Sequence, residues 1–142
     1  MNLDLITIAL SQYGLKETPG AADNPVIMQM AKECGFKDYA HDSTAWCSLF
    51  INWCCYKTGY QRSQSLAARS WLTVGVSIEK PQQGDVVVLW RDSPASWQGH
   101  VGLYINDITP YVYLLSGNQA DMTNIEGFGL NRVLAYRRLA KI

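Results

Sequence analysis

Residues 42–60 read DSTAWCSLFINWCCYKTGY, and this stretch predicts the central helix of the fold. Gly59 is a natural end for that helix, because glycine adopts the left-handed conformation of a helix C-terminus without steric cost. Small polar side chains that favour an N-cap stand at its start, namely Asp42, Ser43 and Thr44. Apolar residues occur on every side of the expected helix, which is typical of a helix buried on all faces.

On either side of this stretch the sequence favours shorter helices. Asp4–Tyr13 is amphipathic and precedes a glycine. Asn24 is a good N-cap for a second helix that begins with proline and runs to about Cys34. A fourth short helix is expected over about Ser65–Leu72.

From Gly84 onward the sequence is typical of strands, with Val, Leu, Ile and Tyr separated by Gly, Pro, Asn and Asp. The expected strands are Asp85–Trp90, Gly99–Asn106, Tyr111–Gly117 and Arg132–Leu139, and Met122–Gly127 is a candidate for a short edge strand. Helices followed by an antiparallel sheet indicate an α+β fold. At 142 residues the chain has the length of one domain, so we expect residues 1–142 to form a single unit.

Composition argues against several classes of partner. The formal net charge is zero, and no basic cluster is longer than Arg137-Arg138, so we expect neither a nucleic acid nor an anionic membrane as partner. No apolar run approaches the roughly 20 residues that span a bilayer. The N-terminus has no positively charged start and no small-residue cleavage site, so we expect no Sec signal peptide.

Cys47 is the candidate nucleophile, because it falls within the first turn of the central helix. Free N–H groups and the helix dipole favour an anion there, which predicts a lowered thiol pKa and a place for an oxyanion. The alternative is that Cys47 is a buried apolar side chain, as unpaired cysteines often are. For Cys34, Cys54 and Cys55 that alternative is the preferred interpretation.

His100 is the candidate base. It lies in the expected strand GHVGLYI, where small neighbours on the same strand leave room for a close helix. If the next strand returns through a turn near residues 107–110, Asn118 lies opposite His100 or one diagonal step away, and can orient the imidazole. The alternatives are a core histidine and a turn asparagine.

A metal site is not expected, because Cys47, Cys54 and His100 have poor ligand spacing for zinc. The chain is rich in tryptophan, and core packing is the usual role for such residues. Trp46 and Trp97 are the candidates for substrate contact. Trp97 is the better of the pair because it directly precedes the His100 strand.

The segments DSTAWCSLFINWCC, LAARSWL, PQQGDVVVLW, GHVGLYI and SGNQ occur in an order and spacing that resemble the CHAP and NlpC-type peptidoglycan hydrolases. The similarity runs from about Leu15 to the C-terminal AYRRL. The resemblance implies a papain-like fold, with Cys47 as nucleophile, His100 as base and Asn118 as the orienting residue. It implies no cofactor and a monomer. The implied reaction is hydrolysis of an amide bond in the peptidoglycan stem peptide, or of the bond joining it to the sugar.

Two other functions stay open on the sequence: a thiol acyltransferase on the same fold, and a non-catalytic cell-wall binding module. If the chain is a hydrolase, it acts in the periplasm or cell wall, either as a phage lysin or as a secreted antibacterial effector. An effector needs a cognate inhibitor (immunity) protein in the producing cell. Neither the setting nor the choice between amidase and endopeptidase follows from the sequence.

Overall fold

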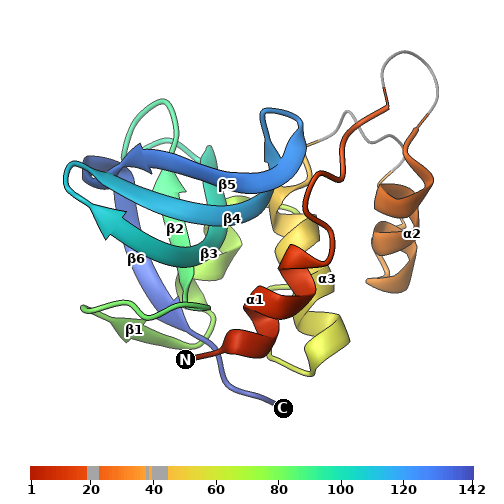
Figure 1. The fold of residues 1–142 in the computed structure, drawn as a ribbon, viewed down its shortest axis with the longest axis horizontal. Coiled ribbons are helices and arrows are strands. Elements are labelled where there is room, and N and C mark those ends of the chain that lie inside the picture. The colour runs from red at the N-terminus through yellow and green to blue at the C-terminus, as the bar shows by residue number, and fades with distance from the viewer. Residues whose placement is uncertain (19–22, 38, 40–44) are drawn as a thin grey trace.

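In the computed structural model, helices pack against one face of an antiparallel sheet (Figure 1). The structure describes residues 1–18, 23–37, 39 and 45–142. Its α-helices are α1 (Leu3–Leu10), α2 (Pro25–Glu33) and α3 (Cys47–Thr58). This arrangement confirms the α+β class.

The sheet has six strands in the order β1-β6-β2-β3-β4-β5, and each neighbouring pair is antiparallel. The strands are β1 (Val76–Ile78), β2 (Val86–Trp90), β3 (Gly99–Ile108), β4 (Tyr111–Gln119), β5 (Met122–Gly129) and β6 (Val133–Arg138), with 3-10 helices η1 (Ala68–Thr73) and η2 (Leu130–Arg132). The sequence predicted five of these strands and missed β1, whose three residues are too few to show a pattern. Where the fourth helix was expected, the chain forms the 3-10 helix η1.

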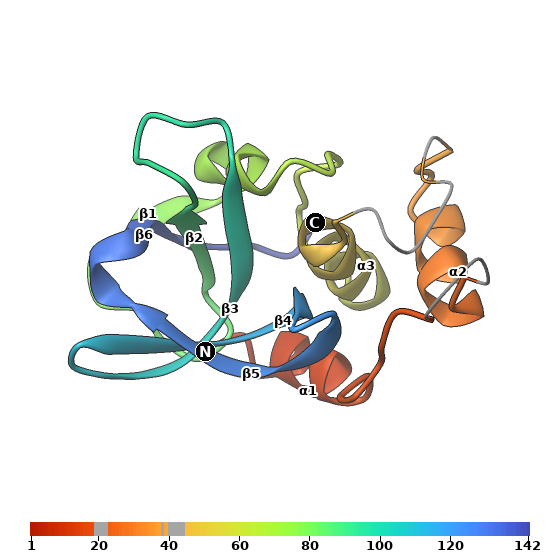
Figure 2. The same ribbon diagram turned by 90° about the horizontal axis from the view of Figure 1, so that it is seen from above.

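Helix α3 is central, as its all-round apolar character predicted. Every residue from Cys47 to Cys55 is buried. The helix ends at Gly59, which has φ of 81° and is therefore in the left-handed conformation. Seen from above, α3 lies between the sheet and α2 (Figure 2). Because α3 contacts β3 and β4 directly, its first turn is held against the strands that carry the other candidate residues.

The shorter helices follow their local signals. The Asn24 side chain accepts hydrogen bonds from the backbone amides of Val26 and Ile27, at 2.8 and 3.4 Å, which confirms the N-cap of α2. Helix α1 covers less than the expected Asp4–Tyr13, because the chain turns after Leu10. Among the described residues, the helices are all too short or too polar to cross a membrane.

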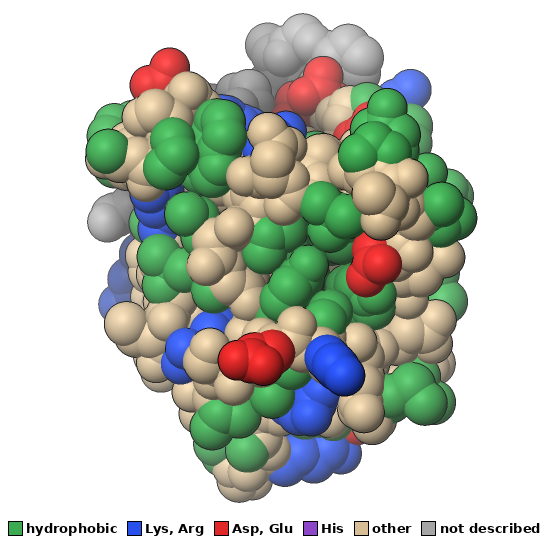
Figure 3. All heavy atoms as spheres, turned by 90° about the vertical axis from the view of Figure 1, so that its left-hand side faces the viewer, with side chains coloured by type: hydrophobic (Ala, Val, Ile, Leu, Met, Phe, Trp, Pro, Cys, Tyr) green, Lys and Arg blue, Asp and Glu red, His purple; other side chains and the backbone are tan. Residues whose placement is uncertain are grey.

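The sheet separates a large core from a small one. Val86, Val88, Val101, Leu103 and Leu115 face the helices and join the large core. On the other face a smaller cluster contains Val87, Leu89, Tyr104, Val112 and Leu114, and half-buried side chains from β5, η2 and β6 border it. From this sheet side of the molecule, hydrophobic side chains are seen to gather near the middle of the face (Figure 3).

The edge of β5 is covered by the segment that follows α1. The amide of Gly14 donates to the carbonyl of Thr123 at 2.8 Å, and the amide of Thr123 donates to the carbonyl of Leu15 at 2.7 Å. The amide of Glu17 then donates to the carbonyl of Asp121 at 3.0 Å. Residues 14–17 therefore pair with the start of the edge strand β5, where both backbone groups of Thr123 are satisfied.

Asp85, at the start of β2, is a structural residue. Its carboxylate is fully buried and accepts two hydrogen bonds of 2.8 Å from the guanidinium of Arg138. Such a bidentate pair is strong where water is excluded. It ties β2 to the end of β6, far along the chain.

Candidate active site

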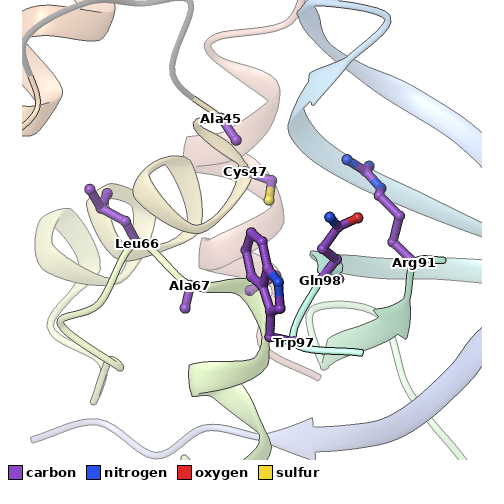
Figure 4. Close-up of a pocket in the computed structure, with 9 residues that line it drawn as sticks. Ala45, Cys47, Leu66, Ala67, Arg91, Trp97 and Gln98 are labelled. Atoms are coloured by element: carbon purple, nitrogen blue, oxygen red, sulfur yellow. The ribbon is translucent and has the colours of Figure 1, made fainter. Parts of the chain in front are cut away.

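Cys47 is the first residue of α3 and lines a pocket of about 280 Å³. Figure 4 shows its sulfur pointing toward Trp97 and Gln98, which form the opposite wall. The expected N-cap residues, Asp42, Ser43 and Thr44, lie outside the described residues. In the structure Trp46 occupies the N-cap position, without a side-chain bond to the helix.

Burial raises the pKa of the Cys47 thiol. The backbone N–H of Val101, the charge of Arg91 and the N–H of Ser48 act in the opposite direction, but they do not offset the loss of water. The expectation of a lowered thiol pKa is therefore wrong for the protein without substrate. The helix N-terminus is present, but the side chain is too buried for the dipole to decide the balance. Cys47 is a neutral thiol at rest.

His100 is buried at the start of β3, on the sheet face away from α3. It pairs with Leu89 across the sheet, and its ring lies 5.1 Å from the ring of Phe128. Burial lowers the pKa of His100 to about 4, although a hydrogen bond from the imidazole to Gln119 opposes this change. At neutral pH the imidazole is therefore uncharged, as a general base must be.

Gln119 determines which nitrogen of His100 carries the proton. The amide nitrogen of Gln119 donates to the carbonyls of Leu114 and Asn124. Its oxygen is thus left to face Nε2 of His100, at 3.0 Å. Because that oxygen can only accept, Nε2 must donate, and the lone pair of the neutral ring lies on Nδ1. Nδ1 is buried and makes no hydrogen bond within the described part of the chain.

Cys47 and His100 approach β3 at the same peptide unit but from its two faces. The amide that lowers the pKa of Cys47 belongs to Val101, the residue after His100. Val101 shares the large core with Cys47, whereas His100 faces the smaller cluster. The backbone ladder between β3 and β4 ends before this point, at the pair Leu103 and Leu115, although the Ser116 hydroxyl still donates to the carbonyl of Val101. Within the described part of the chain, no hydrogen bond joins the imidazole to the thiol.

The expected orienting residue, Asn118, does not occupy that position. A register shift falls between Ser116 and Gln119, and Asn118 has φ of 59°. The shift turns the following side chain toward His100, so the amide that reaches the imidazole is that of Gln119. Both residues carry a side-chain amide and lie in SGNQ, but the prediction of Asn118 holds only for an unbroken strand.

The tryptophans differ sharply in exposure. Trp46 is fully buried, its Nε1 donates to the Glu17 carboxylate at 2.9 Å, and its ring lies against Gly117. A side chain enclosed in this way presents no face to a substrate, so the expected contact of Trp46 with substrate is wrong. Trp97 is 80% exposed and lines the pocket.

Arg69 was not singled out from the sequence, yet it holds the pocket wall. Its guanidinium donates to the backbone carbonyls of Ser93, Pro94 and Gln98, at 2.8 to 2.9 Å. These bonds fix the loop that carries Trp97. The segment LAARSWL contains Arg69, but nothing in the sequence shows which loop it holds.

Comparison with models of known protein families finds no match, and comparison with curated proteins finds no relative of this chain. Within the described residues, no group of three or more His, Cys, Asp or Glu side chains is placed to hold a metal ion.

Proposed function

We propose that the protein is a cysteine hydrolase in which Cys47 is the nucleophile, His100 the base and Gln119 the residue that orients the base. The observation that carries the proposal is the imidazole itself. Gln119 fixes its tautomer so that the lone pair lies on Nδ1, which is buried and has no hydrogen-bond partner among the described residues. The next peptide N–H, that of Val101, acts on the Cys47 thiol. A lone pair held in this way is suited to receive a thiol proton.

The proposed reaction starts from a neutral pair. The S–H proton of Cys47 passes to Nδ1 of His100 around the start of β3, beyond the end of the β3–β4 ladder, as the sulfur attacks the carbonyl carbon of the substrate amide. The resulting oxyanion is stabilised by free backbone N–H groups at the start of α3, among them those of Cys47 and Ser48. The imidazolium then gives its proton to the leaving amine as the C–N bond breaks. A water molecule, deprotonated by His100, attacks the thioester and releases the acid and the free thiol.

The proposed substrate is peptidoglycan, cleaved at an amide bond in or next to the stem peptide, in the periplasm or cell wall. The motif order described above supports this choice, because it resembles CHAP and NlpC-type hydrolases with a papain-like arrangement. The site agrees with it in two respects. The nucleophile candidate begins the helix that packs on the sheet, and an exposed aromatic side chain, Trp97, borders the pocket and offers a face to peptide or glycan.

The test is incubation of the purified protein with peptidoglycan sacculi, followed by mass analysis of the soluble fragments. The wild type is expected to release fragments whose new termini identify the cleaved bond, whereas Cys47→Ala releases none. Cys55→Ala is the matched control, because it removes the same side chain from the same helix away from the pocket. Equal release by wild type and Cys47→Ala, or none by the folded wild type, overturns the proposal.

A further inference from the structure

Among the described residues, the pocket beside Cys47 contains a cation without a counter-ion. Of the described residues that line it, Arg91 alone carries a charge. Arg91 follows the last residue of β2, and Figure 4 shows it on the same side of the pocket as Gln98. Its position makes the pocket positively charged at the wall that faces the sulfur.

Other arginines of the chain are bonded through their side chains. Arg69 donates to the carbonyls of the Trp97 loop, Arg137 to the carbonyls of Val74 and Gly75, and Arg138 to Asp85. The guanidinium of Arg91 makes no hydrogen bond or ion pair with any residue that the structure describes. A guanidinium has five N–H donors in a planar fork, so Arg91 keeps its full capacity to bind a bidentate acceptor.

A second arginine adds to this charge. Arg132 is half-buried, its Nε donates to the carbonyl of Trp90 at 3.1 Å, and its guanidinium lies 5.5 Å from the ring of Phe128. Burial is the main cause that lowers the pKa of Arg132 and of His100, and the charge of Arg91 adds to it at both groups, as the charge of Arg132 does at His100. The positive charges of Arg91 and Arg132 together favour the binding of an anion near His100 and the pocket.

We propose that Arg91, supported by the charge of Arg132, binds a carboxylate of the substrate close to the scissile amide. The inference rests on the proposed function and narrows its substrate class: the site selects stem peptides whose carboxylate beside the cleaved bond is free over those in which it is amidated. A carboxylate suits Arg91 because its two oxygens match the guanidinium fork. A carboxamide loses the charge and one of the two acceptors.

The test measures binding in the Cys47→Ala background, where the substrate is not consumed. The probes are a soluble stem peptide with free carboxylates and the same peptide with its carboxylates amidated, titrated by calorimetry. We expect Arg91→Gln to weaken binding of the free acid about ten- to a hundredfold and to leave binding of the amide unchanged. Arg91→Lys, which keeps the charge but not the fork, is expected to fall between these values.

Lys80→Gln is the control, because it removes one positive charge from an exposed position that does not line the pocket. It is expected to affect neither peptide. The inference is overturned if Arg91→Gln weakens both peptides equally, if it weakens neither, or if the parent Cys47→Ala protein binds neither. Fragment release from sacculi by the wild type tests the hydrolase proposal separately from the role of Arg91. If the wild type releases fragments but Arg91→Gln does not distinguish the two peptides, the proposed hydrolase activity stands and the proposed carboxylate site is rejected.

Discussion

The two regions of α3 that carry cysteines make a direct comparison, because burial is common to both. Burial raises the pKa of Cys47 at the start of the helix and of Cys54 and Cys55 in its middle. The first residue nevertheless lines a pocket and has nearby amides and the charge of Arg91 to oppose that rise. After burial, the next contributions to the pKa of Cys54 come from Cys55 and Cys34 and raise it further, whereas at Cys55 the charge of Arg62 opposes the rise. Access and polar surroundings, not the residue type or its burial, separate the candidate nucleophile from structural cysteines.

The largest effect on hydrolysis is expected from removing His100, and no effect is expected from changing a cysteine in the middle of α3. His100→Gln is expected to reduce kcat/KM on peptidoglycan by a factor on the order of 10³, because it removes the proton acceptor. Cys55→Ala is expected to keep the rate of the wild type. A His100→Gln protein that is folded and hydrolyses peptidoglycan at the normal rate contradicts the role of the imidazole.

Thiol alkylation compares the cysteines directly. In the folded protein, iodoacetamide is expected to modify Cys47 on the order of 10² times faster than Cys54 or Cys55, which are fully buried and react only after local unfolding. Peptide mapping by mass spectrometry identifies the labelled residue. Because burial raises the pKa of Cys47 above its ordinary value, its rate should still increase above pH 9. A rate that is constant from pH 7 upward shows an ionised thiol, contrary to this structure.

The pH dependence of the free energy of unfolding tests whether the imidazole of His100 is buried and neutral in the folded protein. The pKa of His100 is about 4 in the folded protein and about 6.5 in the unfolded chain, so the unfolded state binds the proton first as pH falls. The free energy of unfolding should therefore decrease between pH 6.5 and 4, by about 3 kcal/mol from this group. Urea titrations across this range measure the slope, and His100→Gln should flatten it. An unchanged slope in that variant excludes a buried neutral His100.

The smallest effect is expected at the pocket rim. Trp97 is 80% exposed, so Trp97→Ala should change the free energy of unfolding by less than about 0.5 kcal/mol. If its ring contacts substrate, KM should rise several-fold while kcat is retained. Initial rates over a range of soluble muropeptide concentrations separate these values. If KM is unchanged in Trp97→Ala, the Trp97 ring does not contact the substrate, and the contacts lie deeper in the pocket near Cys47.

Local chemistry explains what was predictable in the fold. The Asn24 cap and the Gly59 stop depend on a few neighbouring residues, so the sequence alone located the start of α2 and the end of α3. The alternation in GHVGLYI predicted β3 for a similar reason. The short strand β1 has no such pattern. It exists because β6 offers it an edge, which is a tertiary effect.

The candidate site was harder to predict, because it depends on distant parts of the chain. The choice of Asn118 failed at one register shift, which places Gln119 beside His100 instead. The expected thiol pKa failed because desolvation depends on everything packed around the sulfur, and the helix start contributes only a part. Trp46 was a candidate for substrate contact as an aromatic side chain, but it is fully buried and its ring nitrogen donates to Glu17.

The segment between α1 and α2 links two properties that are usually separate. Residues 14–17 cover the backbone of β5, and Glu17, at the end of this segment, also bonds the tryptophan immediately before Cys47. Shortening the chain from its first residue through Glu17 would thus bare a strand able to pair with other molecules and, in the same step, loosen the turn that presents the thiol. Truncation of this part of the chain should therefore increase aggregation and reduce hydrolytic activity together.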